Sequence, residues 1–424
     1  MRWRTAVRHQ HRAEFRSLHF PAERFAVVEI AGELVCVVMM RRLLLMFSTC
    51  LWACGDNWRL PPDAPPDAPP FEPAPHVPMP RVFSHAGVVL SAVQLVTITF
   101  EGYALRADVE AFGDMVVGSA WLRNAGAAYH VSAGAHANKQ RLGAAGPSLT
   151  RDDIRHRITD LIAAGDIPRP AAEDNQLVYL VYIPASVAFA DEPDAGDEKS
   201  PWSLAASRFE HGYHEMAKLD SGERFPIAVV VDDGTGLAAT TVAAGHQLIE
   251  AVTNPYEPPF DGYYADPPKT DPWSLVHGEI ADLCEGEDPV VEDGFALPRI
   301  YSNQAAFIGS SPCVPFVSDD TWSDVTARPS QLPMVRRGES VAFELTGWST
   351  REVADWTLRT RVAERSDLSE EQMRPQLSSD TINNKAAATL WLSAPLDAAP
   401  GTVGGVYILS GVHARPWAVG FVVE

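Results

Sequence analysis

The stretch TTVAAGHQLIEAVTNP, from Thr240 to Pro255, predicts the helix around which the fold is expected to form. Thr240 or Thr241 can cap its start, and the helix must end before Pro255, because proline disfavours the helical conformation in the residue before it. His246 and Glu250 are four residues apart, so their side chains lie on one face of the helix. One imidazole and one carboxylate at this spacing can supply two ligands of a tetrahedral zinc site. A solvated His-Glu pair without a metal is the alternative that these two residues leave open.

Helix and strand patterns precede this helix. Thr150 followed by RDDIRHRITDLIAAG predicts a capped helix that ends at Gly165, and LRADVEAFGDMVVGSAWL has the apolar spacing of an amphipathic helix. The β-branched run VVLSAVQLVTITF and the apolar runs QLVYLVYIP and FPIAVVVDD predict strands. We therefore expect an α+β domain over residues 81–325, with a short sheet beside the helix from Thr240 to Thr253.

Residues 326–424 have a different pattern. The segments ESVAFELTGW, DWTLRTRVAE, AATLWLSAP, VYILSGV and WAVGFVVE read as short strands with turn residues between them. Strands at this spacing over about 100 residues predict an all-β immunoglobulin-like sandwich. Because no cluster of titratable residues occurs in this segment, we interpret it as a structural or surface-adhesion module.

The N-terminal residues predict export. A basic MRR segment is followed by the apolar run LLLMFSTCLW, which has the length of a signal peptide and is too short to span a bilayer. The residues LWACGD resemble a bacterial lipoprotein signal in which Cys54 becomes lipidated, and an ordinary signal peptide is the alternative. We assign residues 1–53 to an over-extended N-terminus plus signal peptide. Residues 54–80 form a proline-rich linker, because a segment such as PPDAPPDAPP adopts extended polyproline II.

Charge and cysteine content narrow the classes of partner. The formal net charge is −21, and binding to nucleic acid or to an anionic membrane surface requires clustered Lys and Arg. Nucleic acid is therefore not an expected partner, whereas the lipid anchor predicts attachment to a membrane of the cell envelope. Only Cys284 and Cys313 lie in the expected folded part, and an even pair after a secretory leader predicts one disulfide.

Three further segments follow the helix in order: TNPYEPPFDGYY, WSLVHGEIADLCEG and RIYSNQAAFIGSSPCV. The ordered set resembles the Exordium-like (phosphate-induced) proteins and related bacterial secreted proteins with a zincin-type metallopeptidase helix, over roughly residues 87–314. The resemblance implies a zincin-like domain in which His246, Glu250 and Glu279 bind zinc. It also implies that Cys284 and Cys313 close the loop that holds Glu279 near the helix. Two ligands on one helix do not complete a zinc site, so a third ligand from a separate segment is needed.

The sequence departs from the family pattern H-E-L-x-E-x-x-T-N-P at Gln247. The family has Glu there, which implies a general base. A neutral amide has no usable pKa, and loss of a general base lowers the rate about 10²- to 10⁴-fold. Proteolysis of the usual kind is therefore in doubt, while metal binding is not directly affected.

Other side chains are candidates for the missing role. The segment FEHGYHEMAKL offers His211, His214 and Glu215, of which His214 is the preferred acid or base and a partly exposed loop histidine is the alternative. His277 and Tyr263 rank below it. Asp282 either orients a ligand or is a surface turn residue.

Three functions remain open. The favoured one is an exported, lipid-anchored, zincin-like pseudo-peptidase whose metal-stabilised fold binds a peptide, a glycan or a protein. The alternatives are an active zinc metallohydrolase that uses another base, and a surface-binding protein without metal.

Overall fold

The computed structural model describes residues 19–20, 23–24, 26–30, 33–37, 70–190, 212–256, 262–265, 267–276, 278–308, 310–316, 321–363, 365–411 and 415–424. The chain divides into two compact units, Met1–Pro70 and Phe71–Glu424. In the first unit the short strands β1 (His19–Phe20) and β2 (Glu23–Arg24) pair with each other, as do β3 (Ala26–Ile30) and β4 (Glu33–Val37). The predicted leader and Cys54 lie outside the described residues. None of the helices in the described part of the chain is long and apolar enough to cross a membrane.

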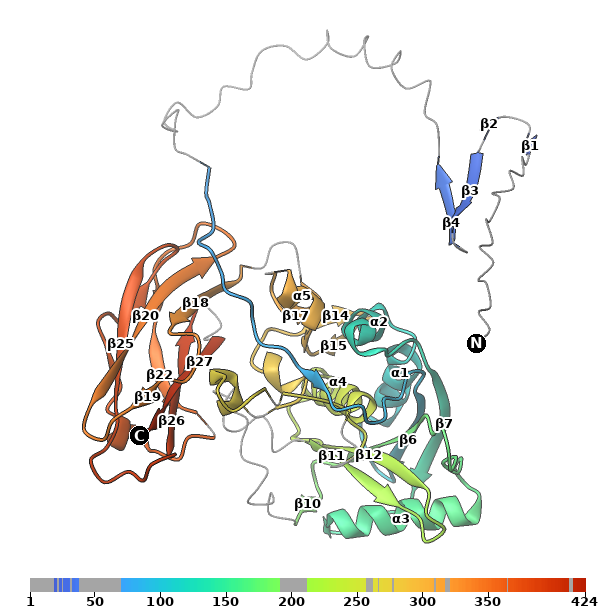
Figure 1. The fold of residues 1–424 in the computed structure, drawn as a ribbon. Coiled ribbons are helices and arrows are strands. Elements are labelled where there is room, and N and C mark those ends of the chain that lie inside the picture. The colour runs from blue at the N-terminus through green and yellow to red at the C-terminus, as the bar shows by residue number, and fades with distance from the viewer. Residues whose placement is uncertain are drawn as a thin grey trace, which may run out of the picture. The chain divides into compact units, whose positions relative to one another are not determined.

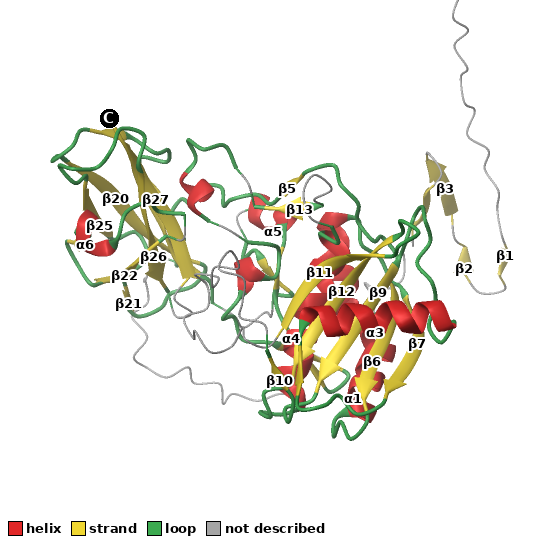
Figure 2. Cartoon of the chain, turned by 90° about the horizontal axis from the view of Figure 1, so that it is seen from below, coloured by secondary structure: helices red, strands yellow, loops and turns green. Residues whose placement is uncertain are grey.

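A five-stranded sheet in the second unit has the order β11-β12-β9-β6-β7 (Figure 1 and Figure 2). Four strands run parallel and only the edge strand β11 is antiparallel to its neighbour. Parallel strands need crossover connections, which helices usually supply. The strands are β6 (Gln94–Phe100), β7 (Ala135–Leu142), β9 (Leu177–Ile183), β11 (Gly212–Lys218) and β12 (Arg224–Val231).

Helices cover both faces of this sheet (Figure 2). Helix α3 (Arg151–Ala164) packs on one face through its buried isoleucines. As predicted, Thr150 caps it through a capping box with Asp153, and Gly165 ends it in the left-handed conformation. The opposite face is covered by α1 (Arg106–Val116) and α4 (Leu237–Thr253), and α2 (Ala120–Gly126) packs against α4 in the same apolar core. All residues of β9 are buried, because both faces of this central strand are covered.

Helix α4 is longer than its sequence predicted. It begins at Leu237 after Gly236, and neither Thr240 nor Thr241 is the N-cap. Both threonine hydroxyls instead donate to helical carbonyls, from Thr240 to Gly236 at 3.1 Å and from Thr241 to Ala238 at 3.3 Å. A threonine inside a helix can bond backward to the preceding turn, and this competes with its use as a cap. The end at Thr253 agrees with the prediction.

The C-terminal strands form two four-stranded sheets, with the orders β18-β20-β25-β23 and β19-β27-β26-β22. Each of the five segments predicted to be extended contributes strand residues. The strands are β18 (Ser323–Arg328), β19 (Met334–Val335), β20 (Ser340–Ser349), β22 (Arg359–Val362), β23 (Gln376–Leu377), β25 (Ala387–Ser393), β26 (Val403–Ser410) and β27 (Arg415–Val423).

The expected fold class is wrong. The chain is mixed α/β and mostly β, with many small sheets beside the larger ones, and its described residues show no clear zincin-like domain followed by a separate sandwich. Packing is also continuous across the expected boundary at residue 325. Leu275, in a 3₁₀ turn (Pro272–Leu275), fills the space where side chains at Gly405 and Gly420 would lie. One apolar core accordingly contains residues from both sides of the boundary.

The last residues of the expected linker pack against the second unit. Ala74 and Met79 are buried, and the ring of His76 lies against Trp348 and Trp417, with centroids 4.6 and 5.4 Å away. The backbone N–H of Ala74 donates to the side chain of Asn384 at 2.8 Å. Residues 71–80 are therefore part of the folded unit, because apolar side chains between the prolines are buried in its core.

Candidate metal centre

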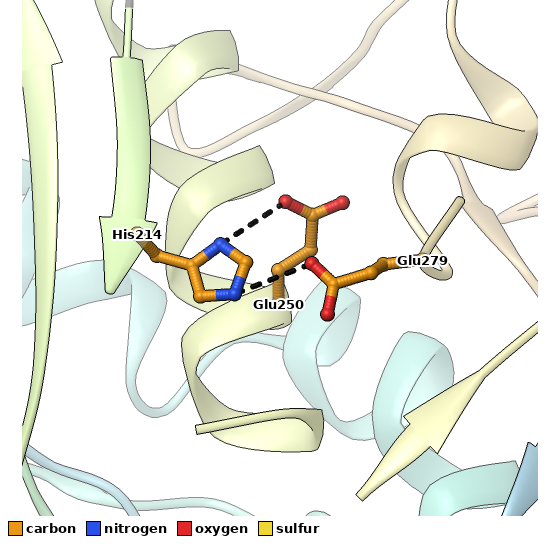
Figure 3. A group of neighbouring side chains, drawn as sticks. All are labelled: His214, Glu250 and Glu279. Carbon is orange, nitrogen blue, oxygen red and sulfur yellow. Dashed lines mark ion pairs between the residues drawn. The ribbon is translucent and has the colours of Figure 1, made fainter. Parts of the chain in front are cut away.

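Helix α4 and strand β11 place three side chains at one site. His246 and Glu250, one turn apart on α4, are both buried. Side chains alternate along β11, so Glu215 points toward α3, where Arg155 binds its carboxylate. His214, the neighbouring residue, points to the opposite face and meets Glu250 (Figure 3). The strand therefore separates a structural ion pair from the candidate site.

Glu250 contacts two histidines, and each histidine contacts a second carboxylate. Its Oε2 atom is 3.0 Å from His246 Nε2 and 3.6 Å from His214 Nδ1. His214 Nε2 is 3.2 Å from Glu279 Oε2, and His246 Nε2 is 3.3 Å from Asp282 Oδ1. These contacts form two groups of possible metal ligands that share Glu250. One contains His214 and Glu279, and the other contains His246 and Asp282.

Backbone and amide groups orient the carboxylates. Glu279 Oε1 accepts a hydrogen bond from the side chain of Asn254, the residue directly after α4. The Oδ1 atom of Asn254 in turn accepts from the backbone N–H of Gly262 at 2.8 Å. Asp282 Oδ2 accepts from the backbone N–H of Glu279 at 2.9 Å. Glu279 and Asp282 each have one oxygen held in this way, and the other oxygen turned toward a histidine.

Gln247 is buried beside the site. A side chain at Gly212 on β11 would lie 2.5 Å from the carbonyl oxygen of Val229 and 3.0 Å from Cγ of Gln247. The small residue at this position therefore gives the Gln247 side chain its space. Gly212 and His214 share one face of β11, so Gln247 and His214 lie against the same face. The Oε1 atom of Gln247 is buried and has no hydrogen-bond partner among the described residues.

Burial and mutual charge set the protonation of the cluster. Burial, strengthened by the charge of Asp282, raises the pKa of Glu250 to about 7. Burial alone would lower the pKa of His246, but the charges and hydrogen bonds of Glu250 and Asp282 outweigh it and hold that pKa well above its usual value. For Asp282 burial acts upward, and the bond to His246 outweighs it, so its pKa lies below the usual value. At neutral pH the imidazole of His246 therefore holds its proton, and the carboxyl of Glu250 is partly protonated.

The donor atoms fit a transition metal in type and spacing. Zinc binds imidazole nitrogen and carboxylate oxygen at about 2.0 to 2.2 Å, which places neighbouring tetrahedral ligands about 3.3 to 3.6 Å apart. The four separations in the cluster, two of which involve Glu250, run from 3.0 to 3.6 Å, and the shorter ones are also hydrogen-bond distances. The longest, 3.6 Å between His214 and Glu250, exceeds an ordinary hydrogen bond and suits two ligands of one ion. The buried Oε1 atom of Glu250 also has no partner among the described residues.

The sequence candidates are partly assembled here. The structure brings His246, Glu250, Glu279 and His214 together, and it also brings in Asp282, for which the sequence leaves a surface turn as the alternative. The predicted disulfide between Cys284 and Cys313 is confirmed, with an Sγ–Sγ distance of 2.05 Å. Two other candidates lie apart from these contacts, since Glu215 pairs with Arg155 and Tyr263 packs on Tyr129. His211 and His277 lie outside the described residues.

Sequence reasoning did not identify Asn254 as a site residue. The residue stands in the segment T-N-P, where proline accounts for the end of the helix and leaves the asparagine without an evident role. Its position after α4, where it reaches Glu279, depends on the fold of the following segment. Two signals in the sequence could have pointed to it: a polar residue between a candidate ligand helix and a proline, and its place in the T-N-P end of the family pattern.

Comparisons with known proteins assign no family. No family model matches the chain, and no curated protein matches it. Among solved structures, a partial match is a family 123 glycoside hydrolase from Clostridium perfringens, described in a study of glycolipid glycan hydrolysis. The identity is 12%, the match covers 25% of this chain and 27% of that chain, and the TM-score is 0.17. The chain thus spans about a quarter of that protein, and a likeness this low supports no statement about fold or activity.

Proposed function

We propose that this chain is an exported, lipid-anchored metalloprotein whose centre binds zinc or a similar divalent ion and serves to bind a ligand at the cell surface. The ligands come from His246, Glu250 and Asp282 on one side and from His214 and Glu279 on the other. One observation carries this proposal. Two imidazoles and three carboxylates from separate segments of the chain lie together in two groups that share Glu250, at separations close to those of metal ligands.

A binding role is favoured over hydrolysis because of Gln247. The residue lies on α4 one turn from Glu250, at the position where the resembled family has its general base, and its amide cannot take up a proton at neutral pH. When bound, the metal would polarise an oxygen of a ligand as a Lewis acid. Gln247 can donate or accept a hydrogen bond with the same ligand, which suits holding a peptide or a glycan.

A digest of a broad peptide library by the purified full chain tests this role. We expect the same products, within error, with and without a chelator, since no carboxylate stands at the general-base position. The matched control is a His246→Ala variant, which should give the same result as the parent. Cleavage that requires the metal, and that both the chelator and His246→Ala abolish, would contradict the binding role.

A metal-dependent hydrolase is the second candidate, and the position of His214 favours it. The two ring nitrogens of His214 lie 3.6 Å from Glu250 and 3.2 Å from Glu279, so this imidazole is inside the site. A histidine at such a place can accept and return a proton. If the digest shows chelator-sensitive cleavage, a loss of activity in His214→Gln with retained metal would identify this residue as the base.

A further inference from the structure

The five side chains of the candidate centre do not form one set of ligands. His214, Glu250 and Glu279 form one group, and His246, Glu250 and Asp282 form another, with the donor atoms of each group within 4.8 Å of one another. The five donors are therefore arranged as two triads that meet at Glu250.

We propose that the site holds two divalent ions, with Glu250 as the bridging carboxylate between them. This inference rests on the proposed function, that the cluster binds metal. One ion takes His246, Glu250 and Asp282, and the other takes His214, Glu250 and Glu279. Each triad has one imidazole and two carboxylates, which is a donor set that zinc accepts.

The two oxygens of Glu250 support a bridging role. Oε2 already contacts both histidines, at 3.0 Å for His246 and 3.6 Å for His214. Oε1 is buried and has no hydrogen-bond partner among the described residues, although the side chain is only 4% exposed. An unsatisfied buried carboxylate oxygen is costly, and a bound ion would satisfy it.

The outer carboxylates each accept a hydrogen bond from a different donor. Asn254 holds Oε1 of Glu279, whereas the backbone N–H of Glu279 holds Oδ2 of Asp282. The remaining oxygens, Glu279 Oε2 and Asp282 Oδ1, turn to different histidines. Each triad therefore has its own terminal carboxylate with its own support, as two neighbouring sites need and as one shared ion would not require.

Charge also permits two ions. With neutral imidazoles the three carboxylates give the cluster a formal charge of −3, so one dication leaves it at −1 and two leave it at +1. Neither count leaves a large uncompensated charge in this buried place. Charge alone therefore does not distinguish one bound ion from two, whereas the number of ions bound per chain can be measured.

The test is a zinc titration of the tag-free, metal-depleted full chain, followed by calorimetry and by metal analysis after gel filtration. We expect two zinc ions per chain in the parent and one in each of the variants Asp282→Asn and Glu279→Gln. The exposed Glu344→Gln, on strand β20, is the matched control and should keep two. One ion in the parent would overturn the two-ion inference and leave the proposed metal centre intact. No ion would overturn both.

Anomalous diffraction from zinc-loaded crystals of the parent provides a second readout that does not depend on any variant folding. Two peaks about 3.5 to 4 Å apart, the separation found in two-metal sites, with Glu250 between them, are expected. A single peak at full occupancy would contradict the inference. Circular dichroism of each variant separates loss of an ion from loss of the fold.

Discussion

His214 on the edge strand β11 and Glu250 on helix α4 lie 3.6 Å apart, from Nδ1 to Oε2. This contact joins β11 to α4, although strand β12 lies between them in the sequence (Figure 3). It makes His214, in the segment FEHGYHEMAKL, a member of the candidate centre. Gln247 lies on the same side of β11 as His214, since its side chain packs beside Gly212.

Replacing Gln247 with Glu should create hydrolytic activity. The carboxylate would stand one turn from Glu250, and a positioned general base contributes about 10²- to 10⁴-fold in rate. The measurement is chelator-sensitive cleavage of the peptide library by Gln247→Glu beside the parent. The isosteric control is Gln247→Met, which should stay inert. If Gln247→Glu binds metal as the parent does and cleaves nothing, the assignment of this position as the lost base is wrong.

Replacing Asn254 with Asp should weaken metal binding without unfolding the chain. Asn254 donates to Glu279, and a carboxylate at the same place would repel it instead. Partners that orient metal ligands are typically worth about 10- to 100-fold in affinity. Competition with a chromogenic chelator measures the change. Asn383, which bonds the exposed Asp355, offers a control, and Asn383→Asp should leave the affinity as it was.

Asp324 should make stability depend on pH. Burial raises its pKa to about 7, against 3.8 for a free carboxyl, so the folded state holds the proton more tightly than the unfolded state. Its contribution to stability is therefore fully present below about pH 4 and is lost as the pH rises through about 7. Asp324→Asn keeps an acceptor for the N–H of Val325 and stays neutral. The variant should therefore avoid a loss of unfolding free energy, on the order of 4 kcal/mol, that the parent undergoes as the pH rises from about 4 to about 7.

Urea unfolding of the parent and of Asp324→Asn at several pH values between 4 and 8 measures this effect. The difference in unfolding free energy between the two proteins should grow with pH in favour of the variant. Parallel curves over the whole range would show that the carboxyl keeps an ordinary pKa in the folded chain.

Removal of the disulfide should destabilise the second unit and loosen Glu279. Cys284 and Cys313 are 29 positions apart, and closing a loop of this size stabilises a protein by about 3 to 4 kcal/mol, mainly through the unfolded state. Urea unfolding of the Cys284→Ala/Cys313→Ala double variant measures the loss. Reductant should destabilise the parent and leave the variant unchanged. An equal effect of reductant on both proteins would contradict this account.

Local signals in the sequence predicted individual elements well. Thr150, Asp153 and Gly165 mark both ends of α3, because capping and a left-handed C-terminal residue depend only on nearby atoms. The i,i+4 pair of His246 and Glu250 likewise follows from helix geometry alone. The single disulfide follows from having two cysteines in the folded part.

Contacts between segments that are far apart in the sequence could not be predicted from such local signals. The parallel pairing of β6, β9 and β12 is set by tertiary packing and not by the composition of each strand, so the fold class was misjudged. The division of ligands into two triads depends on where the segment of Glu279 and Asp282 meets α4. Packing of residues 71–80 was missed because prolines dominate that stretch.

The most direct test of the central claim is the metal content of the full chain, purified without metal supplements after expression into an oxidising compartment. Plasma mass spectrometry should find zinc at one or more ions per chain in the parent, reduced in His246→Ala and absent in Glu250→Ala. The exposed His156→Ala on α3 is the matched control and should match the parent. A parent that carries no transition metal, and that takes up none on titration, would contradict the account.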